Sequence, residues 1–110
     1  MGMTIEELMA ESWQTSYDKG WHDKPKSLAE DIVLMHSELS EALEEVRKGM
    51  APATLYYVVG KPEGVPAELA DVIIRIADCA EHWGMPLGEA IMAKLRYNQT
   101  RPYRHGGKAL

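Results

Sequence analysis

Two short acidic segments, Glu38-Leu39-Ser40-Glu41 and Glu68-Leu69-Ala70-Asp71, constrain this chain more than any other feature. In each segment the carboxylates are three residues apart, which places them one turn apart on one face of a helix. A leucine directly follows the first carboxylate of each pair, so both pairs have the same offset from an apolar stripe. If the two leucines face a common core, the four carboxylates line one flank of two packed helices and converge.

Four converging carboxylates require a cation. Without one, desolvation and mutual repulsion would raise their pKa values and keep some of them protonated. Hard oxygen ligands favour magnesium or manganese over zinc. Glu38 and Glu41 alone would be typical of a solvated helix face, but together with Glu68 and Asp71 they predict a site for Mg²⁺, or for Mn²⁺ in its place.

Periodicity and capping signals predict four helices in one domain spanning residues 1–110. Thr4 with Glu7 and Ser27 with Glu30 are capping boxes, and prolines open the last two helices. The predicted helices run from Ile5 to about Tyr17, from the Ser27 cap to Gly49, from Pro66 to Gly84, and from Pro86 to about Gln99. Short connections between them favour an all-α, four-helix antiparallel bundle.

Residues Met50 to Gly64 interrupt the helical pattern. Prolines and glycines frame Leu55-Tyr56-Tyr57-Val58-Val59, which has strand propensity. We expect a loop that carries one short extended piece, and a single strand must pack on the bundle or pair with a partner chain. The tail that follows Thr100 is too rich in glycine for a further helix.

The composition excludes several classes of protein. Twelve basic and seventeen acidic residues give a net charge of −5, which disfavours a sequence-blind nucleic-acid binder. Cys79 is the only cysteine, so a disulfide framework and a cysteine-based metal site are both excluded. No apolar run approaches the roughly 18 residues of a membrane span, and the first residues are acidic rather than signal-like. We expect a cytoplasmic protein without a nucleic-acid polymer or membrane as partner.

In its acidic segments and its last helix, the chain resembles the MazG-like all-α nucleoside triphosphate pyrophosphohydrolases. The pattern Glu-x-x-Glu, 26 residues, then Glu-x-x-Asp is similar to the metal-binding signature of that family. Lys94-x-x-x-Asn98-x-x-Arg101 is similar to its phosphate-contacting element, and the resemblance covers roughly residues 27–108. Many family members carry one more glutamate where this chain has Met35 or Ser37, which leaves the number of metal ions open.

The resemblance implies a MazG-like fold, Mg²⁺ bound by Glu38, Glu41, Glu68 and Asp71, and hydrolysis of a nucleoside triphosphate between the α- and β-phosphates. Bridging cations would convert the repulsion between carboxylates and a polyanion into binding. Glu41 or Glu45 would position the attacking water as a base. The side chains expected to contact phosphate are Lys94, Asn98, Arg101 and Arg104. The resemblance also implies a pyrimidine or non-standard deoxynucleotide as substrate.

Aromatic residues near the start of the chain are candidates for a nucleobase pocket. Trp13, Trp21 and His22 could supply the flat apolar partner that a base needs. Arg104, His105 and Lys108 could form a lid that phosphate orders. We expect a homodimer or homotetramer, because one small bundle needs a roof over its acidic flank and a second subunit could complete the pocket.

Other interpretations remain beside this one. A carboxylate-bridged di-iron bundle normally uses Glu-x-x-His on two helices, and no glutamate in this chain is followed three residues later by histidine. A catalytically silent helical module that binds nucleotides or a protein partner is the alternative that stays open. For Arg75, we expect an ion pair with Asp71, four residues earlier on the same helix.

Overall fold

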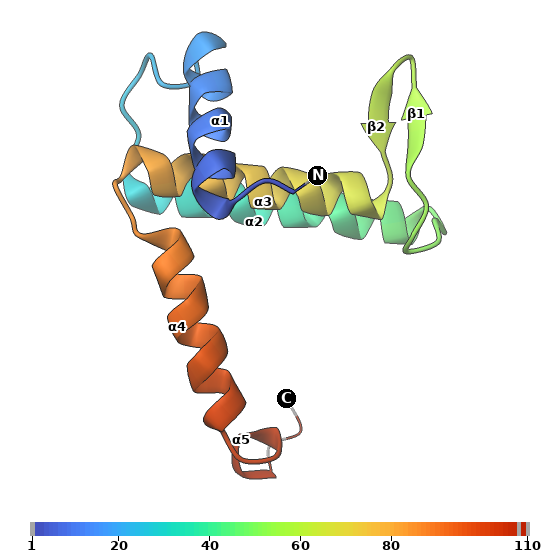
Figure 1. The fold of residues 1–110 in the computed structure, drawn as a ribbon. Coiled ribbons are helices and arrows are strands. Elements are labelled where there is room, and N and C mark those ends of the chain that lie inside the picture. The colour runs from blue at the N-terminus through green and yellow to red at the C-terminus, as the bar shows by residue number, and fades with distance from the viewer. Residues whose placement is uncertain (1, 108, 110) are drawn as a thin grey trace.

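The structure, a computed structural model, describes residues 2–107 and 109. The chain forms α1 (Ile5–Asp18), α2 (Leu28–Arg47), β1 (Tyr56–Val58), β2 (Lys61–Glu63), α3 (Val65–His82), α4 (Leu87–Thr100) and a single helical turn, α5 (Arg104–Gly107) (Figure 1). The prediction of a mostly helical chain is confirmed, and a small two-stranded sheet accompanies the helices.

The helix ends follow the capping signals of the sequence. Thr4 and Ser27 each accept a hydrogen bond from the backbone N–H three residues later, and the glutamate at that position reaches back to the cap. Both capping boxes are therefore formed. Pro66 lies in the first turn of α3, where its missing N–H leaves no helical hydrogen bond unmade.

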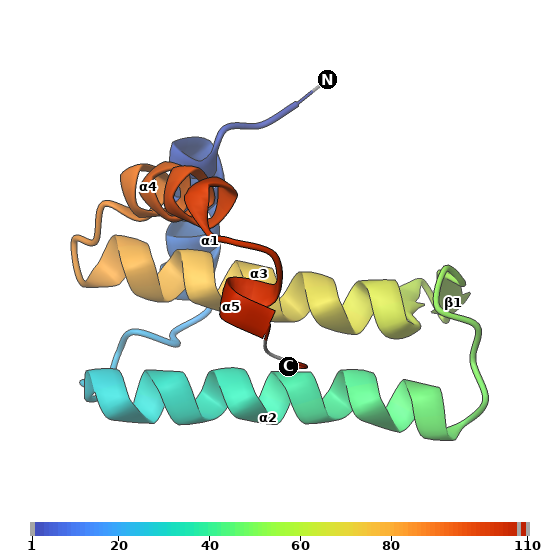
Figure 2. The ribbon, with the colours of Figure 1, turned by 90° about the horizontal axis from the view of Figure 1, so that it is seen from below.

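Helix α3 is the central element of the fold. Helix α2 runs antiparallel beside it along nearly its whole length, and α1 crosses it on the other side (Figures 1 and 2). The small core lies where α1 meets the second half of α3 and consists of Met9, Ala77 and Ala80. Alanines allow α1 to approach α3 closely at this crossing. The partly buried side chains that pack around this core are Ile5, Leu8, Met85 and Leu87.

The four helices were expected to close into one antiparallel bundle. In a single chain they do not, because α4 does not pack along α2 and α3. Helix α4 touches α1, where Gly88 lies against Ile5 and Glu6, and then projects away from α2 and α3 (Figure 1). Among the described residues, none in α4 is buried. The turn at Gly84 and Pro86 directs the helix outward, and helical periodicity carries no information about that direction.

The segment between α2 and α3 is a β-hairpin, which corrects the prediction of a single extended piece. Strand β1 pairs antiparallel with β2 of the same chain, with Tyr57 opposite Pro62. The two-residue turn consists of Val59, with a φ of 49°, and Gly60, with a φ of 80°. Two positive φ values are typical of a type I′ turn, which usually contains Asn-Gly. A β-branched valine is unusual there, so the turn has no recognisable sequence signal.

The tail also departs from the prediction. Residues Arg104–Gly107 form the turn α5 after the extended residue Arg101, although this segment was expected to be too rich in glycine for helix. The turn is short, and Gly106 and Gly107 both have positive φ values, which glycine adopts without a steric penalty.

The chain exposes an unusually large surface. Its accessible area is 8444 Å², whereas a compact monomer of 12.3 kDa exposes about 6,100 Å². Exposed large apolar side chains lie on several elements, and many of them are on α2 and α3. The expectation that Leu39 and Leu69 face a core within the chain is wrong, because both are exposed. Neighbouring apolar side chains that are also exposed are Val33, Leu43, Val46 and Ile73.

Candidate metal and nucleotide site

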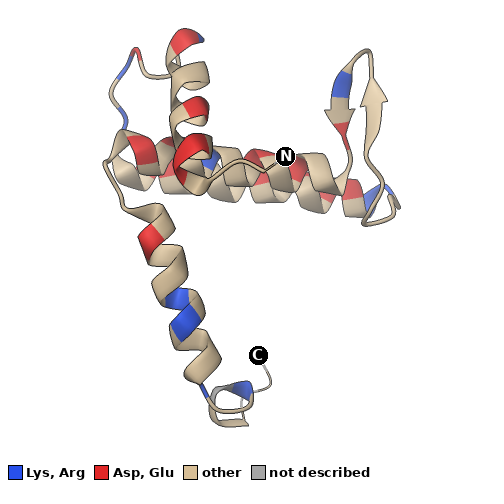
Figure 3. Ribbon diagram, viewed as in Figure 1, with Lys and Arg blue, Asp and Glu red and all other residues tan. Residues whose placement is uncertain are grey.

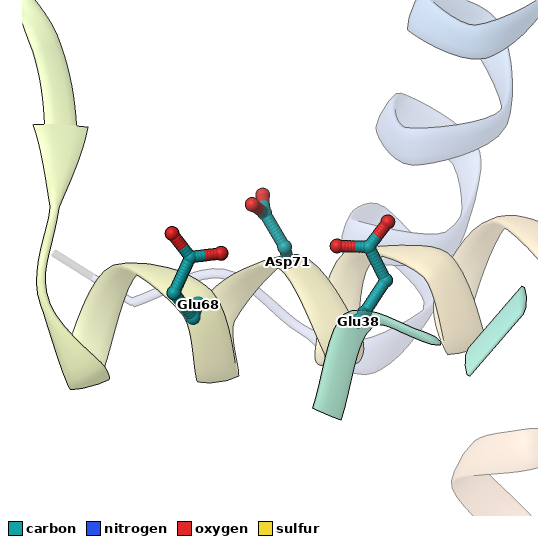
Figure 4. Close-up of side chains that lie close together, drawn as sticks. All are labelled: Glu38, Glu68 and Asp71. Carbon is teal, nitrogen blue, oxygen red and sulfur yellow. The ribbon is translucent and has the colours of Figure 1, made fainter. Parts of the chain in front are cut away.

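Three of the four predicted metal ligands converge. Glu38 of α2 and Glu68 and Asp71 of α3 each place a carboxylate oxygen so that these atoms lie within 4.8 Å of one another. Figure 4 shows the three side chains pointing to the same side of the helix pair, with Asp71 between the other two. The antiparallel pairing of α2 and α3 brings them together, since residue 38 of one helix lies beside residues 68–71 of the other. We call these residues the first triad.

A second group of carboxylates shares Glu68 with the first triad. Oxygens of Glu45, Glu63 and Glu68 also lie within 4.8 Å of one another, and we call these residues the second triad. Glu63 was missed by sequence reasoning, because it lies on β2 and approaches α3 only through the return of the hairpin. A recognisable two-residue turn at Val59-Gly60 would have predicted the hairpin and so the position of Glu63. The residues of this turn are atypical of type I′ turns, so this signal is absent from the sequence.

Glu41, predicted as both a metal ligand and a catalytic base, is not part of either triad. It is exposed on α2, one turn after Glu38. Its charge still acts on the site, since it contributes to the raised pKa of Glu68. Glu41 therefore lies beside the acidic cluster formed by the two triads, within electrostatic reach of it.

The carboxylates of the cluster repel one another. Burial raises the pKa of Glu68 above its ordinary value, and the charges of Asp71, Glu63, Glu41 and Glu45 raise it further. Burial also raises the pKa of Asp71, followed by the charge of Glu38, while Lys61 and Arg75 oppose the shift. The fold thus holds Glu68 and Asp71 where their ionised forms are disfavoured, which is the electrostatic situation that a divalent cation would relieve.

Three cations border the cluster. The Arg75 guanidinium donates a hydrogen bond to Glu38 at 3.0 Å, so the expected ion pair with Asp71 is replaced by one between helices. Lys61 of β2 lies 3.2 Å from Glu63, and Lys48 of α2 lies 3.5 Å from Glu45. Each lysine has a raised pKa, chiefly because of its glutamate partner. These positive charges face the same space as the carboxylates.

Glu45, the second predicted catalytic base, is buried, and its carboxylate is hydrogen-bonded to Tyr56. Its residue is only 2% exposed, and the Tyr56 hydroxyl donates to its two carboxylate oxygens at 3.2 and 3.1 Å. Burial raises the pKa of the Tyr56 hydroxyl, and the hydrogen bond to Glu45 raises it further. Tyr56 belongs to β1, so this contact attaches the hairpin to α2. Glu45 therefore has a structural role at the edge of the cluster.

A pocket of about 500 Å³ opens beside the first triad. Glu38, Asp71, Arg75 and Asp78 form one wall, while a stripe of α1 that includes Ser12, Thr15 and Ser16 forms the opposite wall. Trp21, Lys19 and Lys26 from the end of α1 and the α1–α2 connection complete the lining. We call this space the α1–α3 pocket. Its size suits a small ligand such as a nucleoside.

The predicted aromatic residues divide between this pocket and a neighbouring stack. Trp21 lines the pocket and is 68% exposed, so much of its side chain is accessible to a ligand. Trp13 instead stacks with Tyr17 and with His22, and its indole N–H donates to Nδ1 of His82 at 3.2 Å. His22 stacks on His82 and bonds Asp78 through Nε2 at 2.8 Å. Trp13 and His22 therefore support the pocket wall rather than line the pocket.

The predicted phosphate-contacting residues lie apart from the acidic cluster of their own chain. Lys94 and Asn98 are on α4, Arg101 follows it, and the basic residues of this arm are separated from the acidic α2–α3 pair in Figure 3. Lys94 and Arg101 lie over the Tyr97 ring, at 5.4 and 5.6 Å from its centre. Arg104 lies over Tyr103. Of the expected lid, Lys108 and the His105 side chain lie outside what the structure describes.

Comparisons with known proteins add no relative to these observations. No family model, no curated protein and no solved structure matches the chain. Within residues 2–107 and 109, no helix is long and apolar enough to cross a membrane. Inference about function therefore rests on the acidic cluster, the α1–α3 pocket and the chemistry of their residues.

Proposed function

We propose that this chain hydrolyses a nucleoside triphosphate between its α- and β-phosphates in a magnesium-dependent reaction. The observation that carries the proposal is the convergence of Glu38, Glu68 and Asp71 from two helices at the mouth of a nucleoside-sized pocket. Water would add to the α-phosphorus while the bond to the bridging oxygen breaks, which gives a nucleoside monophosphate and pyrophosphate. The resemblance to the MazG-like family supports the same reaction.

The donor set fits a hard divalent cation. The first triad offers three carboxylate oxygens at mutual distances that allow shared coordination, and all three lie at the surface of the pocket or next to it. Mg²⁺, or Mn²⁺ in its place, would supply charge that bridges and polarises phosphate oxygens. The second triad offers a comparable set, so one or two ions are compatible with the residues present.

Side chains of this chain would orient the substrate around the cluster. Arg75 lines the pocket beside the first triad and can pair with a phosphate oxygen in exchange for Glu38. Lys61 borders the second triad and can neutralise charge on the leaving pyrophosphate. Glu41 is the better candidate for the base that positions water, because Glu45 is buried and its carboxylate already accepts the hydrogen bond of the Tyr56 hydroxyl.

We further propose that two copies of the chain assemble through the exposed apolar faces of α2 and α3. The surplus of about 2,300 Å² over a compact monomer is of the size that a stable dimer buries. Such an assembly supports the expectation that Lys94, Asn98, Arg101 and Arg104 serve the site. These residues are remote from their own cluster, so they would serve the site of the partner chain, where positive charge meets the acidic cluster.

The test is a screen of common and modified nucleoside triphosphates with Mg²⁺, in which monophosphate, diphosphate, pyrophosphate and phosphate are resolved. The expected result is monophosphate plus pyrophosphate, lost on chelation and in Glu41→Gln and Asp71→Asn variants that keep their helical circular dichroism. Release of single phosphate would contradict the proposed bond cleavage. No turnover of any nucleotide, with Mg²⁺ bound, would favour the catalytically silent binding module instead.

A further inference from the structure

The α1–α3 pocket contains two carboxylates that the proposed metal chemistry does not use, Asp78 and Glu11. Asp78 of α3 lines the pocket, and its side chain is 19% exposed. It lies seven residues after Asp71 on the same helix, which is about 10 Å along the axis. In an extended nucleotide, phosphate and base edge are separated on this scale, so a ligand with its phosphates at the first triad would bring its base toward Asp78.

A hydrogen bond to His22 fixes the orientation of the Asp78 side chain. Its Oδ1 lies 2.8 Å from Nε2 of His22, and the His22 ring stacks with the Trp13 ring and with the His82 ring. Among the hydrogen bonds of the described residues, none engages Oδ2 of Asp78. The second oxygen thus remains available as an acceptor on a residue that lines the pocket.

A carboxylate accepts hydrogen bonds but cannot donate them. A base with an exocyclic amino group offers N–H donors to such an acceptor, whereas an oxo group at the same position would repel it. The other acid of the pocket wall away from the triad, Glu11, is exposed, and solvent screens it. Of the lysines, Lys26 is 3.7 Å from Asp31 and Lys19 is exposed. Asp78 is therefore the charged group placed to discriminate, since the hydroxyls of Ser12, Thr15 and Ser16 on the opposite wall can both donate and accept.

We propose that Asp78, oriented by His22, selects nucleotides whose base carries an amino group in place of an oxo group, as in cytosine against uracil or adenine against hypoxanthine. Trp21, which lines the same pocket and is largely exposed, would stack on the same base. This inference rests on the proposed function, because it names the substrate class of that site, and it makes Asp78 a specificity-determining residue that contacts the base and takes no part in the hydrolysis.

Binding of matched monophosphates tests the inference without requiring catalysis. Isothermal titration with Mg²⁺ should show CMP bound about tenfold or more tightly than UMP, and AMP more tightly than IMP, because each partner of a pair differs at the amino position. In Asp78→Asn the amide can also donate, so the CMP to UMP ratio should fall to near one. Glu81→Gln is the matched control, since it removes an exposed charge from the same helix outside the pocket, and it should keep the wild-type ratio.

The outcomes separate this inference from the proposed function. Equal affinity for CMP and UMP, or an unchanged ratio in Asp78→Asn, would overturn the role of Asp78 even if triphosphates are hydrolysed. A strong amino preference without turnover of any triphosphate would instead refute the hydrolase and leave the pocket assignment standing. If Asp78→Asn does not fold, His22→Gln keeps a donor to Asp78 but removes the stack, and a weakened preference in that variant supports the same assignment. No binding of any of the four monophosphates at millimolar concentration would overturn it.

Discussion

Glu68→Gln should stabilise the protein in the presence of a chelator and remove most of its stabilisation by magnesium. Glu68 is shared by both triads, so its carboxylate lies within 4.8 Å of an oxygen of Glu38, Asp71, Glu45 and Glu63. One such pair repels by roughly 0.9 kcal/mol at the dielectric constant of water, and four pairs give roughly 3.5 kcal/mol before any screening.

Neighbouring cations and salt reduce that figure. Arg75, Lys61 and Lys48 each neutralise part of the cluster, and Glu68 is only partly buried. A net gain of about 1 kcal/mol in the free energy of unfolding is therefore expected for the Glu68→Gln variant in chelator. In wild type, Mg²⁺ should add about 1.4 kcal/mol for each tenfold excess over its dissociation constant, and the variant should lose most of this gain.

The assay is urea denaturation monitored by circular dichroism, with EDTA and with increasing MgCl₂. Glu44→Gln is the control, because Glu44 is exposed on α2 and pairs only with Arg47 among the described residues. Its unfolding free energy should change by less than about 0.5 kcal/mol, as for most surface substitutions. Destabilisation of Glu68→Gln by roughly 1 kcal/mol or more in EDTA would refute the repulsive cluster. Equal stabilisation of wild type and variant by Mg²⁺ would refute its role in metal binding.

The pH dependence, the hairpin anchor and the assembly can each be tested in the same way. In a chelator, stability against urea should fall as pH rises above about 4. The pKa values of Glu68 and Asp71 are raised over their ordinary values of 4.5 and 3.8, so the folded state binds protons more tightly than the unfolded state and is destabilised when those protons are lost. Magnesium at neutral pH should flatten this dependence. Tyr56→Phe should raise the unfolding equilibrium constant roughly fivefold or more, because it removes a donor to the buried Glu45. The control Tyr57→Phe, at an exposed ring, should change this constant little. Equal effects of the two substitutions in urea denaturation would contradict the contact that anchors the hairpin. An equimolar mixture of the Asp71→Asn and Arg101→Ala variants should recover about one quarter of wild-type turnover if each arm serves its partner's site, because random pairing makes half of the dimers mixed and each mixed dimer has one intact site of two. No recovery would place the arm elsewhere.

Local signals in the sequence account for the helices and for most of the acidic cluster. Capping boxes, prolines and apolar periodicity depend only on neighbouring residues, so the start of α1 at Thr4 and of α2 at Ser27 could be predicted without tertiary information. The acidic spacing also indicated the convergence of Glu38, Glu68 and Asp71, but it placed Glu41 with them as well, and the leucines on which the argument relied are exposed.

The three-dimensional packing determines which site residues lie at the acidic cluster and which lie away from it. The hairpin places Glu63 in the cluster, and α4 places Lys94 away from it. Nothing in the local sequence of either residue indicates this position. Trp21 reaches the pocket while Trp13 is held in a stack behind it. Helix periodicity determines which face of a helix is apolar, but the direction of a helix after a turn depends on contacts between segments distant in sequence. Those contacts, and not the residue types, determine where each charge is placed.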